Sequence, residues 1–124
     1  MNSKIFLVVR LLLGIMMLVF GVNKFYEFLP PFELTGPPLD YFISLSASKT
    51  LDLVGLVEVL AGLAFVLNRY GALMAVVLMS VSVNAVLFHA TLAPADIGPA
   101  IGMLVLNIIV MIGYKDRYKD LLRA

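Results

Sequence analysis

Residues 51–67 read LDLVGLVEVLAGLAFVL, an apolar run with a carboxylate, Glu58, at its centre. Gly55 and Gly62 flank this residue at helical spacing. A charged side chain at the middle of a membrane-spanning helix costs about 2.5–3.5 kcal/mol on insertion scales, so such a residue turns inward and finds partners. Glu58 therefore marks either a functional site or a polar anchor that holds helices together.

The composition of the whole chain supports a membrane location for this run. Of 124 residues, 62% are hydrophobic and 14% are charged, whereas a soluble domain has roughly 45–50% apolar and about 25% charged residues. We therefore predict an integral membrane protein whose residues 1–124 form one domain. The net charge of +1 argues against nucleic acid as a partner, because a phosphate-binding protein carries a basic stripe.

The chain has no cysteine, which excludes a disulfide, a thiol relay and a thiolate-bound metal or iron–sulfur site. Any redox role would need a bound cofactor or a partner protein.

Four apolar runs are long enough to span a bilayer. With a rise of about 1.5 Å per residue, each can cross a hydrocarbon core of about 30 Å. The first run is longer than the apolar core of a signal peptide and no small-residue cleavage site follows it, so we expect it to remain as an anchor. We predict an all-α integral membrane four-helix bundle with spans near 5–28, 51–67, 70–88 and 97–114.

The distribution of Lys and Arg predicts the orientation. Only Lys24 and Lys49 fall on one side of the predicted membrane, and seven basic residues fall on the other: Lys4, Arg10, Arg69, Lys115, Arg117, Lys119 and Arg123. Since basic residues stay in the cytoplasm, we expect a multi-pass protein of the cytoplasmic (inner) membrane with both termini cytoplasmic.

The first outer loop contains proline pairs that stop helices. Between Pro38 and Ser48, the order of Leu39, Tyr41-Phe42, Ile43 and Leu45 fits a short interfacial helix. An ordered loop packed on the bundle fits the same residues.

Glycines predict where helices pack closely, because small residues let backbones approach in a membrane. Gly14 and Gly21 share a face of the first span, and Gly55 and Gly62 share a face of the second. The pair Gly98 and Gly102 opens the fourth span. We read all of these glycines as close-packing positions.

The candidate ligand-binding residues lie at similar depth in the outer half of the bundle: Lys24, Glu58, Asn84 and His89, with Asn23 beside them. A buried ion pair with Lys24 is the simplest way to neutralise Glu58. Alternatively, burial favours the protonated carboxyl, which would donate a hydrogen bond to Asn84 or to a ligand carbonyl. The cluster is thus either a polar lock between helices or a ligand or proton site.

Arg10 and His89 have sequence contexts that suggest neither a metal site nor a catalytic site. Arg10 lies about one turn inside the cytoplasmic end of the first span, so we expect its side chain to extend to the lipid headgroups. His89 is the only histidine, and a metal site built on it would need carboxylates for its other ligands, so we expect no metal. No nucleophile-plus-base pair or glycine-rich phosphate loop is present, and the residues alone do not decide whether the protein is an enzyme.

Several motifs recur in a characteristic order: Arg10-xxx-Gly14, Gly21-xx-Lys24-Phe25, Glu58-xxx-Gly62, Asn68-Arg69-Tyr70-Gly71, His89, and Tyr114-Lys115-Asp116-Arg117-Tyr118. In these the chain resembles the DoxX-like family of small four-span membrane proteins. The resemblance implies a four-helix membrane bundle. The family takes its name from a quinone-linked thiosulfate-oxidising subunit, and related proteins are linked to redox complexes or to the assembly of membrane proteins. The cysteine-free chain departs from relatives that carry out thiol chemistry.

Two functions follow. In the first, a membrane subunit binds a small apolar molecule such as a quinone or a lipid between its helices, and supports electron transfer by another membrane or redox protein. In the second, the protein is a non-catalytic assembly or scaffold protein. An open cavity beside Glu58, lined by Phe and Met, would favour the first, and dense packing around a closed Glu58–Lys24 pair would favour the second.

Overall fold

The computed structural model describes residues 1–31 and 33–124. All regular structure among these residues is helical, which confirms the predicted all-α class. The elements are α1 (Ser3–Asn23), α2 (Pro37–Ala47), α3 (Thr50–Leu67), α4 (Gly71–Leu92), the short 3-10 helix η1 (Pro94–Asp96), α5 (Gly98–Gly113) and the 3-10 helix η2 (Lys115–Tyr118).

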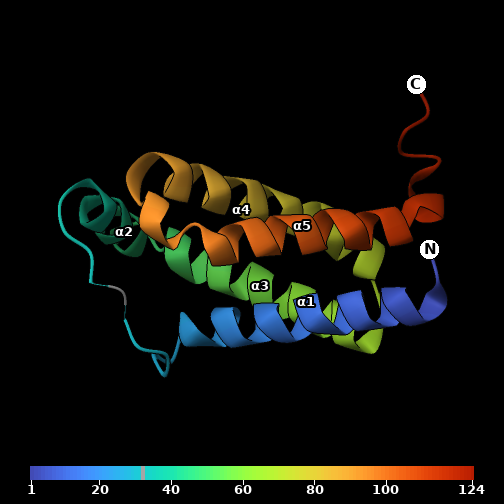
Figure 1. Ribbon diagram of the computed structural model, residues 1–124, viewed down its shortest axis with the longest axis horizontal. Helices are drawn as coiled ribbons and strands as arrows, with labels where there is room; N and C mark the ends of the chain where they lie inside the picture. The colour runs from blue at the N-terminus through green and yellow to red at the C-terminus, as the bar shows by residue number, and fades with distance from the viewer. Residues whose placement is uncertain (32) are drawn as a thin grey trace.

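Four of these helices form the bundle. Helices α1, α3 and α4 are long and apolar enough to cross a membrane, and α5 is a shorter apolar helix. Helix α1 packs against α3 and α5, and α4 packs against the same two, so neighbours in the bundle run antiparallel (Figure 1). Both termini lie at one end of this helical membrane bundle, and α2 lies at the other.

The first and third spans differ from their predicted bounds. Helix α1 ends at Asn23 rather than at residue 28, because the Asn23 Oδ1 atom accepts hydrogen bonds of 2.9 Å from the amides of Phe28 and Leu29. These bonds turn the chain away from the helix axis. Asn23 therefore shapes the loop and does not join the predicted polar cluster. Helix α4 continues to Leu92, which places His89 inside its last turn.

The close-packing prediction is confirmed for Gly14, Gly21, Gly55 and Gly62, which lie where α1 packs against α3. A Cβ atom on Gly62 would lie 2.7 Å from Leu18 Cγ and 2.8 Å from the carbonyl oxygen of Gly14. A Cβ on Gly21 would lie 2.9 Å from the amide nitrogen of Val59. The backbones of the two helices thus approach closely between Gly14 and Gly21 on α1 and between Gly55 and Gly62 on α3.

The close-packing prediction is wrong for the fourth span. A Cβ atom on Gly98 or Gly102 would meet nothing within 4 Å. The buried face of α5 instead carries Ala100, Met103, Asn107 and Val110. The glycine spacing of α5 therefore did not mark the face that turns inward.

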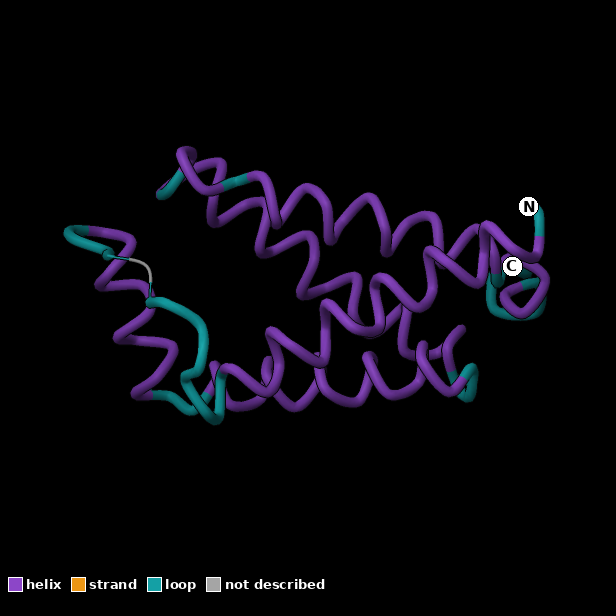
Figure 2. Tube along the Cα trace, turned by 60° about the horizontal axis from the view of Figure 1, so that its bottom comes forward, coloured by secondary structure: helices purple, strands orange, loops and turns teal. Residues whose placement is uncertain are grey.

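Helix α2 forms over the predicted residues and packs across the end of the bundle. The Tyr41 and Phe42 rings lie 4.9 and 5.0 Å from the Phe88 ring, centre to centre. Figure 2 shows the bundle helices close together at the end with the termini and farther apart toward α2. The segment is therefore both a helix and a packed cover.

The hydrophobic core occupies the half of the bundle nearer the termini. Its fully buried residues come from all four helices of the bundle: Leu13, Met17, Ala61, Phe65, Ala75, Leu78 and Val110. On α3 they lie toward the C-terminal end and on α4 toward the N-terminal end, and both of these ends meet at the 68–70 turn. The α2 half holds a cavity in place of such a core.

Candidate functional site

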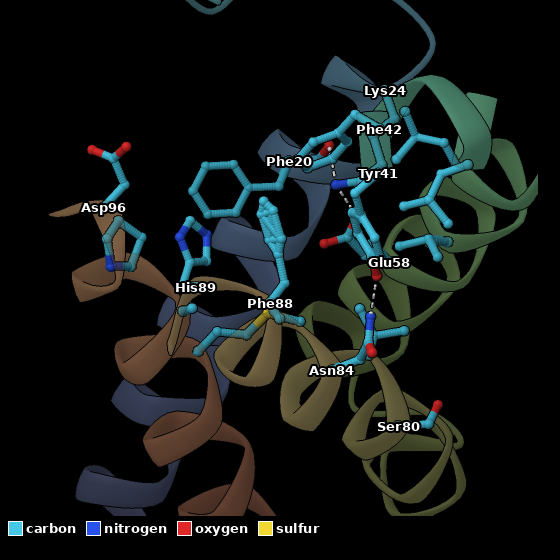
Figure 3. A pocket seen from close by; sticks show the side chains of 18 of the residues that line it. Phe20, Lys24, Tyr41, Phe42, Glu58, Ser80, Asn84, Phe88, His89 and Asp96 are labelled. Atoms are coloured by element: carbon cyan, nitrogen blue, oxygen red, sulfur yellow. Dashed lines mark hydrogen bonds and ion pairs between the residues drawn. The ribbon is translucent and has the colours of Figure 1, made fainter. Parts of the chain in front are cut away.

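A cavity of about 480 Å³ lies between α1, α2, α3, α4 and the start of α5. Its lining includes all four residues that the sequence nominates: Lys24, Glu58, Asn84 and His89 (Figure 3). The structure thus brings them to one space from three helices. Their role in binding a ligand stays a prediction.

Most of the residues that line the cavity are apolar, and several of these are aromatic or sulfur-containing. Figure 3 shows the rings of Phe20, Phe42 and Phe88 around the space, with Tyr41 beside them, and Met16 and Met103 complete this part of the lining. The sequence indicated that Phe and Met residues could line a cavity, but it did not indicate which of them do. Tyr41 and Phe42 line the cavity because α2 carries them, and the sequence predicted this helix to lie at the membrane surface.

The predicted ion pair between Lys24 and Glu58 is present, with the Lys24 Nζ atom against Glu58 Oε1. The two side chains are 22% and 4% exposed. Glycines make this approach possible: a Cβ on Gly55 would lie 3.0 Å from Lys24 Cβ, and one on Gly21 would lie 3.0 Å from Glu58 Cβ. The close contact of α1 and α3 thus positions both charges.

Asn84 takes a different partner from the one considered for Glu58. Its Nδ2 atom donates a hydrogen bond of 2.9 Å to the Tyr41 hydroxyl oxygen. This bond ties α2 to α4 across the cavity. Asn84 therefore holds the cover in place while its side chain still lines the space.

His89 lies on the other side of the aromatic rings from the ion pair, near Asp96 (Figure 3). Its Nδ1 atom is 3.2 Å from the carbonyl oxygen of Ala93. Because a carbonyl oxygen only accepts, this contact assigns the proton of a neutral ring to Nδ1 and leaves Nε2 as an acceptor. The cavity thus has a cationic donor at one side and a histidine acceptor at the other.

The sequence prediction for the Arg10 side chain is wrong. The side chain does not extend to the headgroup level: it is only 8% exposed, and its NH1 atom donates a hydrogen bond of 2.5 Å to the carbonyl oxygen of Phe65. This carbonyl is free because the amide of Arg69 bonds to Ala64 O instead. An unpaired acceptor at a helix end attracts a donor, and Arg10 supplies it.

Arg10 belongs to a second polar cluster, at the end of the bundle with the termini. The Tyr114 hydroxyl donates to Asn68 Oδ1 at 2.6 Å, and the Tyr118 hydroxyl donates to the carbonyl oxygen of Ala72 at 2.6 Å. Burial raises the pKa of Tyr118, which keeps its hydroxyl a donor. The sequence motifs around residues 10, 68–71 and 114–118 therefore meet in space, a convergence that their separate positions did not predict.

A third polar contact lies in the middle of the bundle. Ser82 Oγ donates to Asn107 Oδ1 at 2.7 Å, and Asn107 Nδ2 donates to the carbonyl oxygen of Ala75 at 3.0 Å. Both side chains are fully buried. These bonds lock α4 to α5 without any contribution from Glu58.

Metal-ligating side chains are dispersed. Among residues 1–31 and 33–124, no three His, Cys, Asp or Glu side chains gather closely enough to hold a metal ion.

Comparison with known protein families gives a match over most of the bundle. A family model described as DoxX matches residues 5–91, which is more than half of the chain and runs from α1 almost to the end of α4. Neither the curated proteins nor the solved structures that were compared contain a match.

Proposed function

This chain belongs to the DoxX family of membrane proteins, and we propose that it binds a small apolar molecule, a quinone or a lipid, in the cavity beside Glu58. In this proposal it serves as a membrane subunit of a redox complex. The observation that carries the proposal is that one cavity of about 480 Å³ contains Lys24, Glu58, Asn84 and His89. Pockets of roughly 300–1,000 Å³ with mainly apolar walls and a few polar groups are typical ligand sites.

The polar groups of the cavity suit a flat ring with an oxygen at each side. The Lys24 ammonium can donate to a carbonyl oxygen, and His89 Nε2 can accept from a hydroxyl. Between them, the Phe20 and Phe88 rings offer faces and edges for stacking. These features favour a quinone or hydroquinone head group over a plain acyl chain, and the family resemblance supports the same choice.

The proposal assigns electron transfer to a partner membrane or redox protein. The chain has no cysteine, so a redox role depends on a bound molecule or a partner. In this arrangement Lys24, Glu58 and His89 orient the bound molecule, and the partner exchanges electrons with it.

The distribution of basic residues also supports a location for the protein. We infer one domain in the cytoplasmic membrane, with both termini in the cytoplasm. The seven-to-two distribution of basic residues supports this orientation, as does the placement of both termini at one end of the bundle (Figure 1).

A scaffold role is the second candidate, and the closed Lys24–Glu58 pair between tightly packed helices favours it. In that case the pair acts only as a polar lock. However, the Ser82–Asn107 contact already provides a buried lock, and a lock needs no cavity. We therefore prefer the ligand-binding role.

The test is mass spectrometry of the organic extract from purified protein. We expect an apolar molecule with wild type that is depleted in Glu58→Leu and in Ala85→Phe, since Ala85 lines the cavity and a larger side chain would fill it. Ala90→Phe makes the same change on the same helix at an exposed position outside the cavity, and should retain the molecule.

A short-chain benzoquinone provides a direct probe of the same site. Its binding should weaken with Ala85→Phe and not with Ala90→Phe. Extracts without any bound molecule from all folded variants, together with equal benzoquinone binding by both Phe variants, would favour the scaffold role.

A further inference from the structure

A groove of about 390 Å³ lies between the C-terminal half of α3 and the start of α4. It shares no lining residue with the cavity beside Glu58, and it lies at the opposite end of the bundle, where the 68–70 turn joins the two helices. Its walls include Leu60, Leu63, Leu67 and Leu73, and its end is formed by Arg69 and Tyr70.

The walls of this groove face outward. Leu60, Leu63, Leu67 and Leu73 are exposed large hydrophobic residues, and on a membrane-spanning helix such side chains meet lipid rather than water. From Leu60 to Leu67 the groove follows about 10 Å of helix, at about 1.5 Å per residue. An acyl chain can lie along such a groove.

One cation lies at the end of the apolar walls. Within the described part of the chain, no carboxylate lies within 4.0 Å of Arg69, whereas Lys119 and Arg123 at the same end pair with aspartates. The short turn holds Arg69 there, because Asn68 and Tyr70 on either side have left-handed backbones with φ values of 53° and 58°. A guanidinium group binds phosphate oxygens through paired N–H donors.

An apolar groove with Arg69 at its end, and no carboxylate within 4.0 Å of that side chain in the described part of the chain, complements a lipid with an anionic headgroup. We propose that this groove binds one anionic phospholipid, with an acyl chain along Leu63, Leu67 and Leu73 and its phosphate on Arg69. The exposed Tyr70 ring lies beside the headgroup. This site is independent of the function proposed for the cavity.

Native mass spectrometry of the detergent-purified protein, titrated with phosphatidylglycerol, tests the proposal. We expect Arg69→Gln to weaken binding about fivefold, since one basic residue near an anionic lipid contributes about 1 kcal/mol. Arg69→Lys should keep most of the affinity. Arg117→Gln is the matched control, because Arg117 is exposed at the same end of the bundle but lies outside the groove.

A second pair of variants tests the apolar walls. Leu63→Trp should fill the groove and reduce binding, whereas Leu12→Trp, at an exposed position on α1, should not. Thermal unfolding of each variant checks that it remains folded.

Three outcomes would overturn the proposal. Equal weakening by Arg69→Gln and Arg117→Gln would indicate general surface attraction. Equal affinity for phosphatidylcholine and phosphatidylglycerol that Arg69→Gln leaves unchanged would remove both the preference for an anionic headgroup and the phosphate contact with Arg69. A dimer that Leu63→Trp disperses while phosphatidylglycerol binding stays constant would assign the groove to a second copy of the chain.

Discussion

Arg10 on α1 donates a hydrogen bond to the carbonyl oxygen of Phe65 in the last turn of α3, at 2.5 Å. The C-terminus of a helix carries a partial negative charge as well as unpaired carbonyl groups. Arg10 therefore satisfies an acceptor and compensates a dipole from a neighbouring helix. The guanidinium carbon also lies 5.9 Å from the centre of the Phe6 ring, which gives the buried charge an aromatic neighbour.

This contact predicts the effect of substitution at Arg10. We expect Arg10→Leu to lower the free energy of unfolding by about 1–3 kcal/mol, the cost of leaving a buried acceptor unpaired. Arg10→Lys should lose less, because an ammonium still compensates the helix end. Thermal or denaturant unfolding in detergent measures both, with exposed Arg117→Leu as the control. If Arg10→Leu were as stable as wild type, the cost of burying the guanidinium would equal the value of its bond.

The different exposure of Lys24 and Glu58 predicts that substituting one of them lowers the stability more than substituting the other. Glu58 is 4% exposed and Lys24 is 22% exposed, so an unpaired Lys24 can turn toward the surface more easily than an unpaired Glu58. Breaking a buried pair costs about 3–5 kcal/mol, and we expect Lys24→Met to approach this loss and Glu58→Leu to lose less. The double variant should be more stable than Lys24→Met alone. Purely additive effects in this double-mutant cycle would mean that the two residues are not coupled.

Glu58→Gln addresses the role of the charge itself. Its amide oxygen can still accept a hydrogen bond from Lys24, so we expect a milder loss of stability and of ligand than with Glu58→Leu. The extract assay and thermal unfolding measure the two effects. Equal and complete loss in both variants would show that the negative charge is essential, and no loss in either would remove Glu58 from the site.

Glycine substitutions test the packing of α1 on α3. In Gly62→Ala the new Cβ would lie 2.8 Å from the Gly14 carbonyl oxygen, and because this is backbone, the helices must move apart. We expect a clear loss of stability. Gly102→Ala meets nothing within 4 Å and should stabilise the protein by up to about 1 kcal/mol through helix propensity. Unfolding measurements that ranked the two variants the other way would contradict the described interface.

Topology can be measured directly. Reporter fusions at Ala124 and in the loop near Thr35 should report opposite sides of the membrane, with Ala124 in the cytoplasm, because the basic residues gather at the end with the termini. Reports from the same side would show that the chain crosses the membrane an even number of times between these two points, or not at all.

The sequence alone determined the helical class, the number of apolar runs and the depth of the polar residues. These are local properties, because an apolar run satisfies its backbone bonds internally and advances at a constant rise per residue. Opposite charge and equal depth made a Lys24–Glu58 pair the simplest interpretation, with a protonated Glu58 as the alternative. The glycines at positions 14, 21, 55 and 62 predicted close packing, since they recur at helical spacing on single faces, but they did not predict which helix each face would meet.

Only the tertiary structure decided which way each side chain faces. Helices that are apolar on every side carry no stripe to mark their inner surface, so their rotation about the axis follows from packing. That rotation turned Arg10 inward to Phe65 and turned Gly98 and Gly102 away from their neighbours. The packing of α2 against the bundle likewise determined that Asn84 forms its hydrogen bond with Tyr41 rather than with Glu58. The cavity beside Glu58 exists because α2 covers the end of the bundle where the helices diverge, and no local pattern in the sequence encodes that divergence.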